Sequence, residues 1–578
     1  MPIFRFRGLG NKGVVTDTPP FDLPPDTWSQ ARNVRFQAGR VQKVGGNKPA
    51  LTRNMPNEVP LAIVQRPLSE NLIYGSYRPS DLNGSLWRVE GPFHANISMR
   101  DSSGVNPVSY EVRPSQTWDY TTLSNTVIFN TPLIDPQGLE PGSEYFSNLP
   151  GWGHPNSSDY DESGQVIPGS IGSNWKAKRI RAYKNYLLCL GIIENGAEYH
   201  QRIRWSDVTQ LNRLPQNWIE NSETSDGGFN DLSDSQSYII DGRPLRDSFV
   251  IYTNRDTFIM DYVGGTMVFN FRKIFSDSGI LAPNCCIEFE GKHFVISEED
   301  IFVHNGSTRQ SIAIGRIKEK LMTDISSVNF LATKVYSYPT RKEIWITYVG
   351  PGNTANPEGT GDNNFACDKV AIWSWQYDTW SFADLPNIYD IGMGVAPDTD
   401  LRIWDQYNPD GVPGENGPEW ESSSIEEDVW EQFSQTFTSH IMFAPSSDGF
   451  FYNLDTGYYT YSHNSNTNLF DRSPVVCEVT KQGIDMDEQE QDINYLKWWR
   501  SIYPQMAGEG TVRFFVGGSD NAYKDPEWDS TQSFTIGSDT KVDCFSNYRY
   551  AAIKIQDANE GSWSFTGFDV EYFREGNR

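Results

Sequence analysis

The chain has 578 residues, a length that exceeds one ordinary hydrophobic core and predicts two to four domains or one large repeat architecture. Its 37% hydrophobic, 13% aromatic and 21% charged residues, with 48 Gly and 34 Pro, are typical of many short strands joined by turns. The formal net charge of −27 disfavours tight binding to nucleic acid, but it is compatible with a pore through which DNA slides as well as with an ordinary acidic surface.

The first part of the chain, residues 1–60, is predicted to be a loop-rich N-terminal docking segment. A short helix is predicted over residues 27–32, with Asp26 as its N-cap. Residues 34–46 alternate apolar and polar side chains around Gly39, a pattern that predicts a β-hairpin.

Residues 61–174 are predicted to form an inserted β domain with scattered strands. Its second part, 131–174, is rich in Pro, Gly, Ser and Asp. A stretch of this length is too long for an ordinary connection in a compact domain. We therefore expect a functional surface loop or an arm that contacts a partner.

From residue 175 onward, short apolar runs alternate with turn-forming residues. Evenly spaced short strands are typical of a propeller, a sandwich or a barrel. The recurring pairs of strands favour four-stranded blades, so residues 175–470 are predicted to be a β-propeller-like domain, although no fixed period is present. The predicted strands are 186–190, 202–206, 249–252, 257–262, 292–296, 301–304, 311–314, 343–348 and 370–375.

One helix is predicted inside this region, over residues 315–325, because Ile317, Leu321 and Ile325 repeat at helical spacing and form an apolar stripe. Two long inserted loops are predicted at 351–366 and 396–436. The second loop ends in an acidic segment that is interpreted either as a solvated loop or as a protruding tip. Its candidate channel or tip residues are Glu419, Glu421, Glu426, Glu427, Asp428 and Trp430.

The last predicted domain comprises residues 471–578. Its sequence again indicates strands, for example at 510–518 and 550–555, and we expect these to form a C-terminal β-sandwich. The predicted fold is therefore mainly β. It combines a propeller-like repeat of short antiparallel strands, a C-terminal β-sandwich and long inserted loops.

The sequence contains no recognisable catalytic or metal-binding motif. None of its seven His lies at HExxH or zinc-site spacing, and His293 and His304 are interpreted as ordinary sheet residues. Walker and GxSxG motifs are absent, and the repeated boxes of sialidase-like propellers are missing. We therefore expect a protein that is not an enzyme and that uses no cofactor and no metal.

Cysteine usage and hydropathy indicate where the protein is made. Six Cys in 578 residues do not form a disulfide framework, which predicts assembly in a reducing cytoplasm. The chain begins without an apolar signal core, and no segment approaches the ~20 apolar residues of a membrane-spanning helix. We expect no stable membrane insertion.

Three groups of segments share aromatic and glycine patterns that occur together in one protein family: first 28–46, then 278–306 with 315–325 and 373–386, and finally 563–578. Their order and their spread over most of the chain resemble the tail nozzle family, also called tail tubular protein B, of short-tailed bacteriophages.

This resemblance implies a virion protein of the phage tail tip that is assembled in the host cytoplasm. It implies a homohexameric ring whose channel retains double-stranded DNA and then conducts it during ejection, without sequence-specific binding. Its implied protein partners are a tail adaptor ring and tail fibres. Two alternatives stay open: a receptor-binding tail adhesin that stacks aromatic residues on sugars, and a glycosidase-like propeller.

Overall fold

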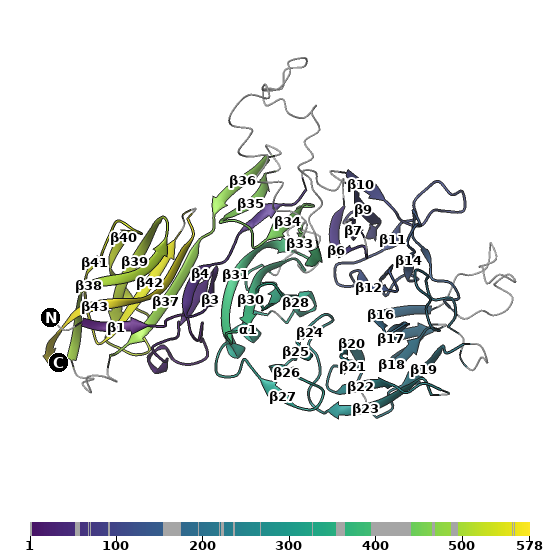
Figure 1. Cartoon of the computed structure of the whole chain (residues 1–578), viewed down its shortest axis with the longest axis horizontal. Helices are drawn as coiled ribbons and strands as arrows, with labels where there is room; N and C mark the ends of the chain where they lie inside the picture. The colour runs from purple at the N-terminus through teal and green to yellow at the C-terminus, as the bar shows by residue number, and fades with distance from the viewer. Residues whose placement is uncertain are drawn as a thin grey trace, which may run out of the picture. The chain divides into compact units, whose positions relative to one another are not determined.

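In the computed structural model nearly all of the regular elements in the described residues are β-strands (Figure 1). The structure describes residues 3–51, 58–67, 69, 71–90, 93–153, 175–194, 196–218, 220, 225–234, 237–265, 267–325, 327–353, 365–394, 441–464, 469–486, 495–557, 559 and 561–577. The predicted loop 396–436 lies outside these residues, as do residues 354–364 of the predicted loop 351–366.

The chain forms two compact units, each of which combines segments that are far apart in the sequence. The first, which we call the sandwich unit, comprises Met1–Lys48, Leu232–Ile388 and Asp455–Arg578. The second, which we call the blade unit, comprises Pro49–Asp231 and Tyr389–Leu454. The domain boundaries predicted from the sequence, after residues 60, 174 and 470, stay predictions.

The sandwich unit contains three four-stranded antiparallel sheets in which the strand order follows the chain. The first consists of β20 (Ile239–Leu245), β21 (Ser248–Thr253), β22 (Thr257–Tyr262) and β23 (Phe269–Phe275). The second consists of β24 (Cys286–Phe289), β25 (Lys292–Ile296), β26 (Ile301–His304) and β27 (Arg309–Ser311). The third consists of β28 (Lys334–Tyr338), β29 (Glu343–Tyr348), β30 (Cys367–Ser374) and β31 (Thr379–Ile388).

The blade unit contains further sheets of the same size. In three of them the strand order follows the chain. The first consists of β6 (Val59–Gln65), β7 (Leu72–Tyr77), β9 (Leu86–Glu90) and β10 (Phe93–Asn96), and the second of β12 (Asp119–Leu123), β13 (Thr126–Asn130), β14 (Gln137–Leu139) and β15 (Ser147–Asn148). The third consists of β16 (Trp175–Tyr183), β17 (Tyr186–Glu194), β18 (Ala197–Trp205) and β19 (Gly228–Asp231). Another contains β32 (Gly392–Gly394), β33 (Ile441–Pro445) and β34 (Phe451–Leu454), while β5 (Asn47–Pro49) spans the boundary at residue 48. A small pair consists of β8 (Asn83–Gly84) and β11 (Tyr110–Glu111).

Strands in the middle of these sheets are buried on both faces. The β29 residues, Glu-Ile-Trp-Ile-Thr-Tyr, are all buried, and the first seven residues of β17 are buried too. Such strands read as continuous apolar runs instead of alternating patterns. This is why residues 186–190 and 343–348 were recognisable as strands from the sequence.

The predicted loop at 131–174 is wrong in its first part. Residues 137–148 contain β14 and β15, and β14 pairs with β13 through Val127↔Leu139. All three β14 residues are buried, because the short strand completes the sheet although its composition is that of a loop. Residues 154–174 lie outside the described part of the chain.

The sandwich unit also contains a β-sandwich, most of whose strands are labelled in Figure 1. One sheet contains β1 (Ile3–Arg7), β3 (Val34–Gln37), β4 (Arg40–Lys43), β43 (Trp563–Asn577), β38 (Tyr495–Gly508) and β41 (Val542–Tyr548). The other contains β2 (Gln30–Arg32), β37 (Cys477–Ile484), β42 (Tyr550–Asp557), β39 (Thr511–Ser519) and β40 (Glu527–Thr535). The predicted mainly β fold, with a propeller-like repeat and a C-terminal sandwich, is confirmed.

The N-terminal residues contribute four strands to this sandwich. The hairpin predicted at 34–46 is confirmed as β3 and β4, with Gln37 opposite Arg40. Ala38 and Gly39 have φ values of 49° and 74°, which are the positive values that a two-residue hairpin turn requires.

The helix predicted over residues 27–32 is wrong, because this segment enters the sandwich as an extended chain. Ala31 lies opposite Val479 of β37, and the Trp28 side chain is fully buried. Pairing and burial outweigh the weak local helix propensity of so short a segment.

The helix predicted over residues 315–325 is confirmed, with shorter bounds, as α1 (Lys318–Asp324), and Ile317, Leu321 and Ile325 are buried as expected. The Asp17 carboxylate accepts hydrogen bonds from the backbone N–H groups of Glu319 (2.9 Å) and Lys320 (3.3 Å) in its first turn. Two 3₁₀ turns, η1 (Pro20–Asp22) and η2 (Phe330–Ala332), and a ribbon of β35 (Tyr459–Asn464) and β36 (Leu469–Pro474) complete the described elements. None of the helices in this part of the chain is long and apolar enough to cross a bilayer.

Candidate functional site

The residues predicted from the sequence to line a channel or tip lie outside the described part of the chain. These are Glu419, Glu421, Glu426, Glu427, Asp428 and Trp430. Their role stays a prediction, and the candidate site described below is built from other residues.

The segments that carry the family resemblance meet in one hydrophobic core of the sandwich unit. Trp28 and Phe36 of the first segment share this core with Phe294 and Trp373 of the middle segments and with Phe565 of the last. The ring centroids of Trp28 and Phe565 are 6.1 Å apart. The Phe36 backbone carbonyl accepts a hydrogen bond of 3.1 Å from the hydroxyl of Thr379, in the middle group of segments. These segments therefore form a single structural centre, although more than 500 residues separate the first from the last.

The first of these segments is basic in an acidic protein. Residues 1–51 contain eight Lys or Arg and three acidic residues. Several of the cations pair with carboxylates from distant parts of the chain: Arg7 with Asp569, Arg32 with Asp384, Arg35 with Glu343 and Asp455, and Lys43 with Asp557. Charge complementarity therefore adds to the apolar core in holding the N-terminal strands.

Arg35 is the centre of the most deeply buried of these groups. Its guanidinium donates two hydrogen bonds to Glu343 (2.9 and 3.2 Å) and two to Asp455 (both 3.0 Å). The side chains of all three residues are at most 4% exposed. Burial alone would lower the pKa of Arg35, but the carboxylates of Asp455 and Glu343 outweigh it and raise this pKa. The Arg35 side chain therefore remains charged, with both carboxylates fixed around it.

Asp455 also binds other groups. Its Oδ1 accepts a hydrogen bond from the Gly45 backbone N–H (2.8 Å), and its Oδ2 lies 3.4 Å from Arg341 Nε. Only the Nε of Arg341 lies near Asp455, so the two terminal nitrogens of its guanidinium keep their capacity to donate hydrogen bonds. Its side chain is 42% exposed.

A second buried ion pair lies on the neighbouring strand. Lys43 Nζ donates to Asp557 (2.7 Å) and to the Asn559 carbonyl (2.6 Å), and both ionic side chains are 1% exposed. The Trp563 indole N–H donates to the same Asp557 carboxylate at 2.7 Å. The pair is thus hydrogen-bonded on both sides, as buried charges require.

A third polar group connects the N-terminal segment to β31. The Asp384 carboxylate accepts hydrogen bonds from Arg32 (2.7 Å), Asn33 (2.9 Å) and Lys369 (2.7 Å). Burial would raise the pKa of Asp384, but these three donors lower it overall. Asn33, with φ 56°, also accepts a hydrogen bond from the Asp384 backbone N–H, at 2.8 Å.

A cleft of about 440 Å³ opens between these groups, within the sandwich unit. Its lining contains the cations of Arg35, Lys43 and Arg341 and the carboxylate of Asp455. Gln42, Tyr458, Ser562, Trp563, Ser564, Ala507, Gly45, Gly457 and Gly508 line the remainder. The cleft is our candidate functional site, because it is polar, concave and positioned by buried ion pairs.

A different group of polar side chains lies between two four-stranded sheets of the sandwich unit, the sheet of β20–β23 and the sheet of β24–β27. Tyr252 donates its O–H to His293 Nδ1 (2.7 Å) and accepts from His304 Nε2 (2.6 Å). His293 Nε2 donates to the Pro244 carbonyl (2.7 Å), and His304 Nδ1 accepts from the Gly306 backbone N–H (3.1 Å). The partners assign one tautomer to each neutral ring, so every ring nitrogen is satisfied.

Burial keeps these histidines neutral. It lowers the pKa of His293 to about 4 and, together with the nearby His293 and Arg309, the pKa of His304 to about 3. The two residues occupy opposed positions on β25 and β26, so their interpretation as sheet residues holds. Their arrangement stabilises the structure and offers no open position to a substrate.

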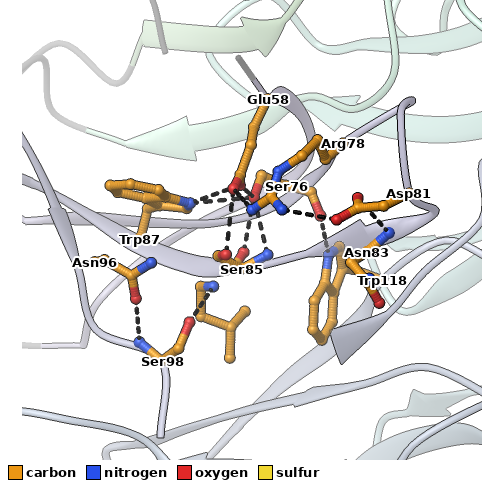
Figure 2. Close-up of polar contacts among 11 residues, drawn as sticks. Glu58, Ser76, Arg78, Asp81, Asn83, Ser85, Trp87, Asn96, Ser98 and Trp118 are labelled. Carbon is orange, nitrogen blue, oxygen red and sulfur yellow. Dashed lines mark hydrogen bonds and ion pairs between the residues drawn. The ribbon is translucent and has the colours of Figure 1, made fainter. Parts of the chain in front are cut away.

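The blade unit has its own buried carboxylate, Glu58, which is 7% exposed (Figure 2). Glu58 pairs with Arg78 at 2.7 Å and accepts hydrogen bonds from the Ser76 hydroxyl and from Trp87 Nε1, the latter at 3.0 Å. The Ser85 hydroxyl contributes a further, longer contact of 3.4 Å. These donors satisfy the Glu58 carboxylate, so we interpret this group as structural.

No group of three or more His, Cys, Asp or Glu suited to a metal ion occurs among the described residues. Sequence reasoning missed the cleft, because nothing in the sequence indicates which of the 75 acidic residues pairs with Arg35 or Lys43. One signal was available, namely the excess of basic residues in the first 51 positions of an acidic chain.

No family model matches the chain, and no curated protein matches it. Among solved structures, a fungal alcohol oxidase of the AA5 family in complex with copper aligns with 92% of this chain and 99% of its own, at 8% identity and a TM-score of 0.37. YCF48 from Cyanidioschyzon merolae aligns with 71% of this chain and 98% of its own, at 8% identity and a TM-score of 0.34. PorZ, a type-IX secretion component of Porphyromonas gingivalis, covers 60% of this chain at 8% identity and a TM-score of 0.33, and this chain spans 35% of PorZ. At such TM-scores these similarities assign no function.

Proposed function

We propose that the chain is a structural subunit of the tail tip of a short-tailed phage, of the nozzle type. One observation carries the proposal: the segments that resemble the nozzle family meet in one core of the sandwich unit. Patterns of aromatic residues and glycine are common in β proteins, so scattered matches would be weak support. Segments that are distant in sequence and contiguous in space are what a shared structural module requires.

The buried ion pairs are consistent with a mechanical role. Arg35 and Lys43 connect the N-terminal strands to Glu343, Asp455 and Asp557 in low-dielectric surroundings, where breaking one pair is costly. A subunit that retains pressurised DNA needs such resistance to local opening. In this proposal the chain forms a homohexameric ring, contacts a tail adaptor and tail fibres, and lets DNA pass without specific binding.

The oligomeric state tests this proposal. We expect the purified full chain, alone or mixed with its tail adaptor protein, to give a sixfold ring in native mass spectrometry and negative-stain images. A monomer that cleaves a polysaccharide would overturn the structural role.

The tip assignment of Glu419, Glu426 and Trp430 needs its own experiment. Virions lacking residues 351–366 and 396–436 should lose packaged DNA, and unchanged DNA retention would refute a tip role for these loops.

One observation favours a second candidate, a receptor-binding adhesin. The Trp498 ring stacks between Phe545 and Phe573 at centroid distances of 6.4 and 5.3 Å, and Phe545 is 68% exposed. Exposed aromatic faces suit stacking on sugar rings. A stable trimer that binds host glycans would favour this function over the nozzle.

A further inference from the structure

The charged cleft of the sandwich unit contains hydrogen-bond donors that no protein group uses. Asp455 occupies Arg341 Nε, while the two terminal nitrogens of this guanidinium have no partner among the described residues. The same holds for the side-chain polar atoms of Gln42, Tyr458 and Ser564. These groups come from different strands and loops and line one space of about 440 Å³.

The other charges of the cleft are committed to each other. The Arg35 guanidinium uses four of its five N–H donors on Glu343 and Asp455, and Lys43 Nζ is held by Asp557 and the Asn559 carbonyl. They therefore form a fixed wall. Arg341 remains as the cation with capacity for a ligand, and guanidinium nitrogens bind carboxylates and phosphates in bidentate fashion.

The lining of the cleft favours an anion over a cation. Of the three cationic side chains that line it, Arg35 and Lys43 are already paired with buried carboxylates, so the preference for an anion comes from the terminal nitrogens of Arg341. Hydroxyl groups and an amide at the rim supply neutral donors for the remaining polar atoms of a ligand. A volume of this size is typical of small-molecule sites.

We propose that this cleft binds a small organic anion whose carboxylate or phosphate group is held by the terminal nitrogens of Arg341. The Tyr458 hydroxyl, the Ser564 hydroxyl and the Gln42 amide contact the rest of the ligand. This inference does not rest on the tail-tip function, since it follows from the cleft alone.

The test is calorimetric titration of the full chain with three probes at constant ionic strength: inorganic phosphate, glucuronate and, as a neutral control, glucose. We expect saturable binding of phosphate or glucuronate and none of glucose. Binding of phosphate alone would assign a phosphate ligand, and binding of glucuronate alone a carboxylate.

Arg341→Gln should weaken binding of the preferred anion by at least about tenfold, the loss expected from removing a charge-assisted contact. Arg272 offers a matched control, because its Nε also lies 3.4 Å from an aspartate Oδ2, that of Asp261, and its side chain is 55% exposed. Arg272→Gln should leave binding unchanged.

Tyr458→Phe provides a second variant that retains all charges, and it should weaken binding by a few-fold. This variant keeps the proposal testable if Arg341→Gln does not fold. Absence of saturable anion binding, equal losses in the Arg341 and Arg272 variants, or full binding by both Arg341→Gln and Tyr458→Phe would overturn the proposal.

Discussion

The two units hold their buried charges in contrasting ways. In the sandwich unit, Arg35 pairs with carboxylates 308 and 420 positions away in the chain. In the blade unit, the partners of Glu58 lie 18 to 29 positions away. A centre of the second kind can form within one stretch of chain, whereas the first requires three distant segments to assemble together. The comparison shows that similar buried ionic groups can connect neighbouring strands in one unit and segments that are distant in the sequence in the other.

The largest expected effect comes from the long-range centre. Arg35→Met leaves Glu343 and Asp455 buried without their cation, and we expect the unfolding free energy to fall by about 3–5 kcal/mol. Urea unfolding followed by tryptophan fluorescence would measure the loss.

The matched control for this change is Arg7→Met. Its ion pair with Asp569 is also short, at 2.6 Å, but the Arg7 side chain is 44% exposed. We expect a loss of at most about 1 kcal/mol. If both variants lose the same amount, burial of the Arg35 centre is not what stabilises the sandwich unit.

The next effect depends on pH. His293 and His304 have folded-state pKa values of about 4 and about 3, below the ordinary value of 6.5. Between these values the unfolded chain binds more protons than the folded chain, so acid favours unfolding. Stability should be fully present above pH 6.5 and should fall as the pH drops toward 4, by up to about 1.4 kcal/mol per pH unit for each histidine.

Other groups titrate in the same range, so the slope must be compared with that of a variant. The double variant His293→Gln, His304→Gln removes both protonation sites. Its unfolding free energy should depend less steeply on pH between 6.5 and 4 than that of the unaltered chain. Parallel slopes would mean that the Tyr252 hydrogen-bond chain does not control acid stability.

A smaller and more local effect is expected in the blade unit. Glu58→Gln replaces a carboxylate acceptor that serves Ser76, Arg78 and Trp87, at a cost of about 1–3 kcal/mol. Hydrogen exchange should accelerate in β7 and β9 and should stay unchanged in β38 and β43. Faster exchange in the sandwich strands would contradict the local character of this centre.

The smallest effect belongs to a surface pair. Lys320 and Asp324 form an ion pair of 2.8 Å at i,i+4 spacing on α1. Lys320→Ala should lower stability by only about 0.3–0.5 kcal/mol. A loss of more than about 1 kcal/mol in thermal unfolding would show that α1 depends on this pair more than its exposure indicates.

Local patterns predicted the fold where local physics determines it. The hairpin at 34–46, the helix around Leu321 and the apolar strand at 343–348 follow from turn chemistry, periodicity and hydrophobicity. The segment 27–32 was misread because Trp28 is buried by residues hundreds of positions away. The cleft was invisible for the same reason, since its pairs, such as Arg35 with Asp455, are set by tertiary contacts.

The pairing of β1 with β43, in which Ile3 lies opposite Glu571, has a consequence for synthesis on the ribosome. The β1 strand must wait for a partner that is translated more than 500 residues later. During that interval β1 and the edge of β4 that later pairs with β43 are unprotected, and such edges are prone to pair with other chains. Arg5, Arg7 and Arg40, all exposed in the folded sheet, would keep such nascent segments apart by repulsion.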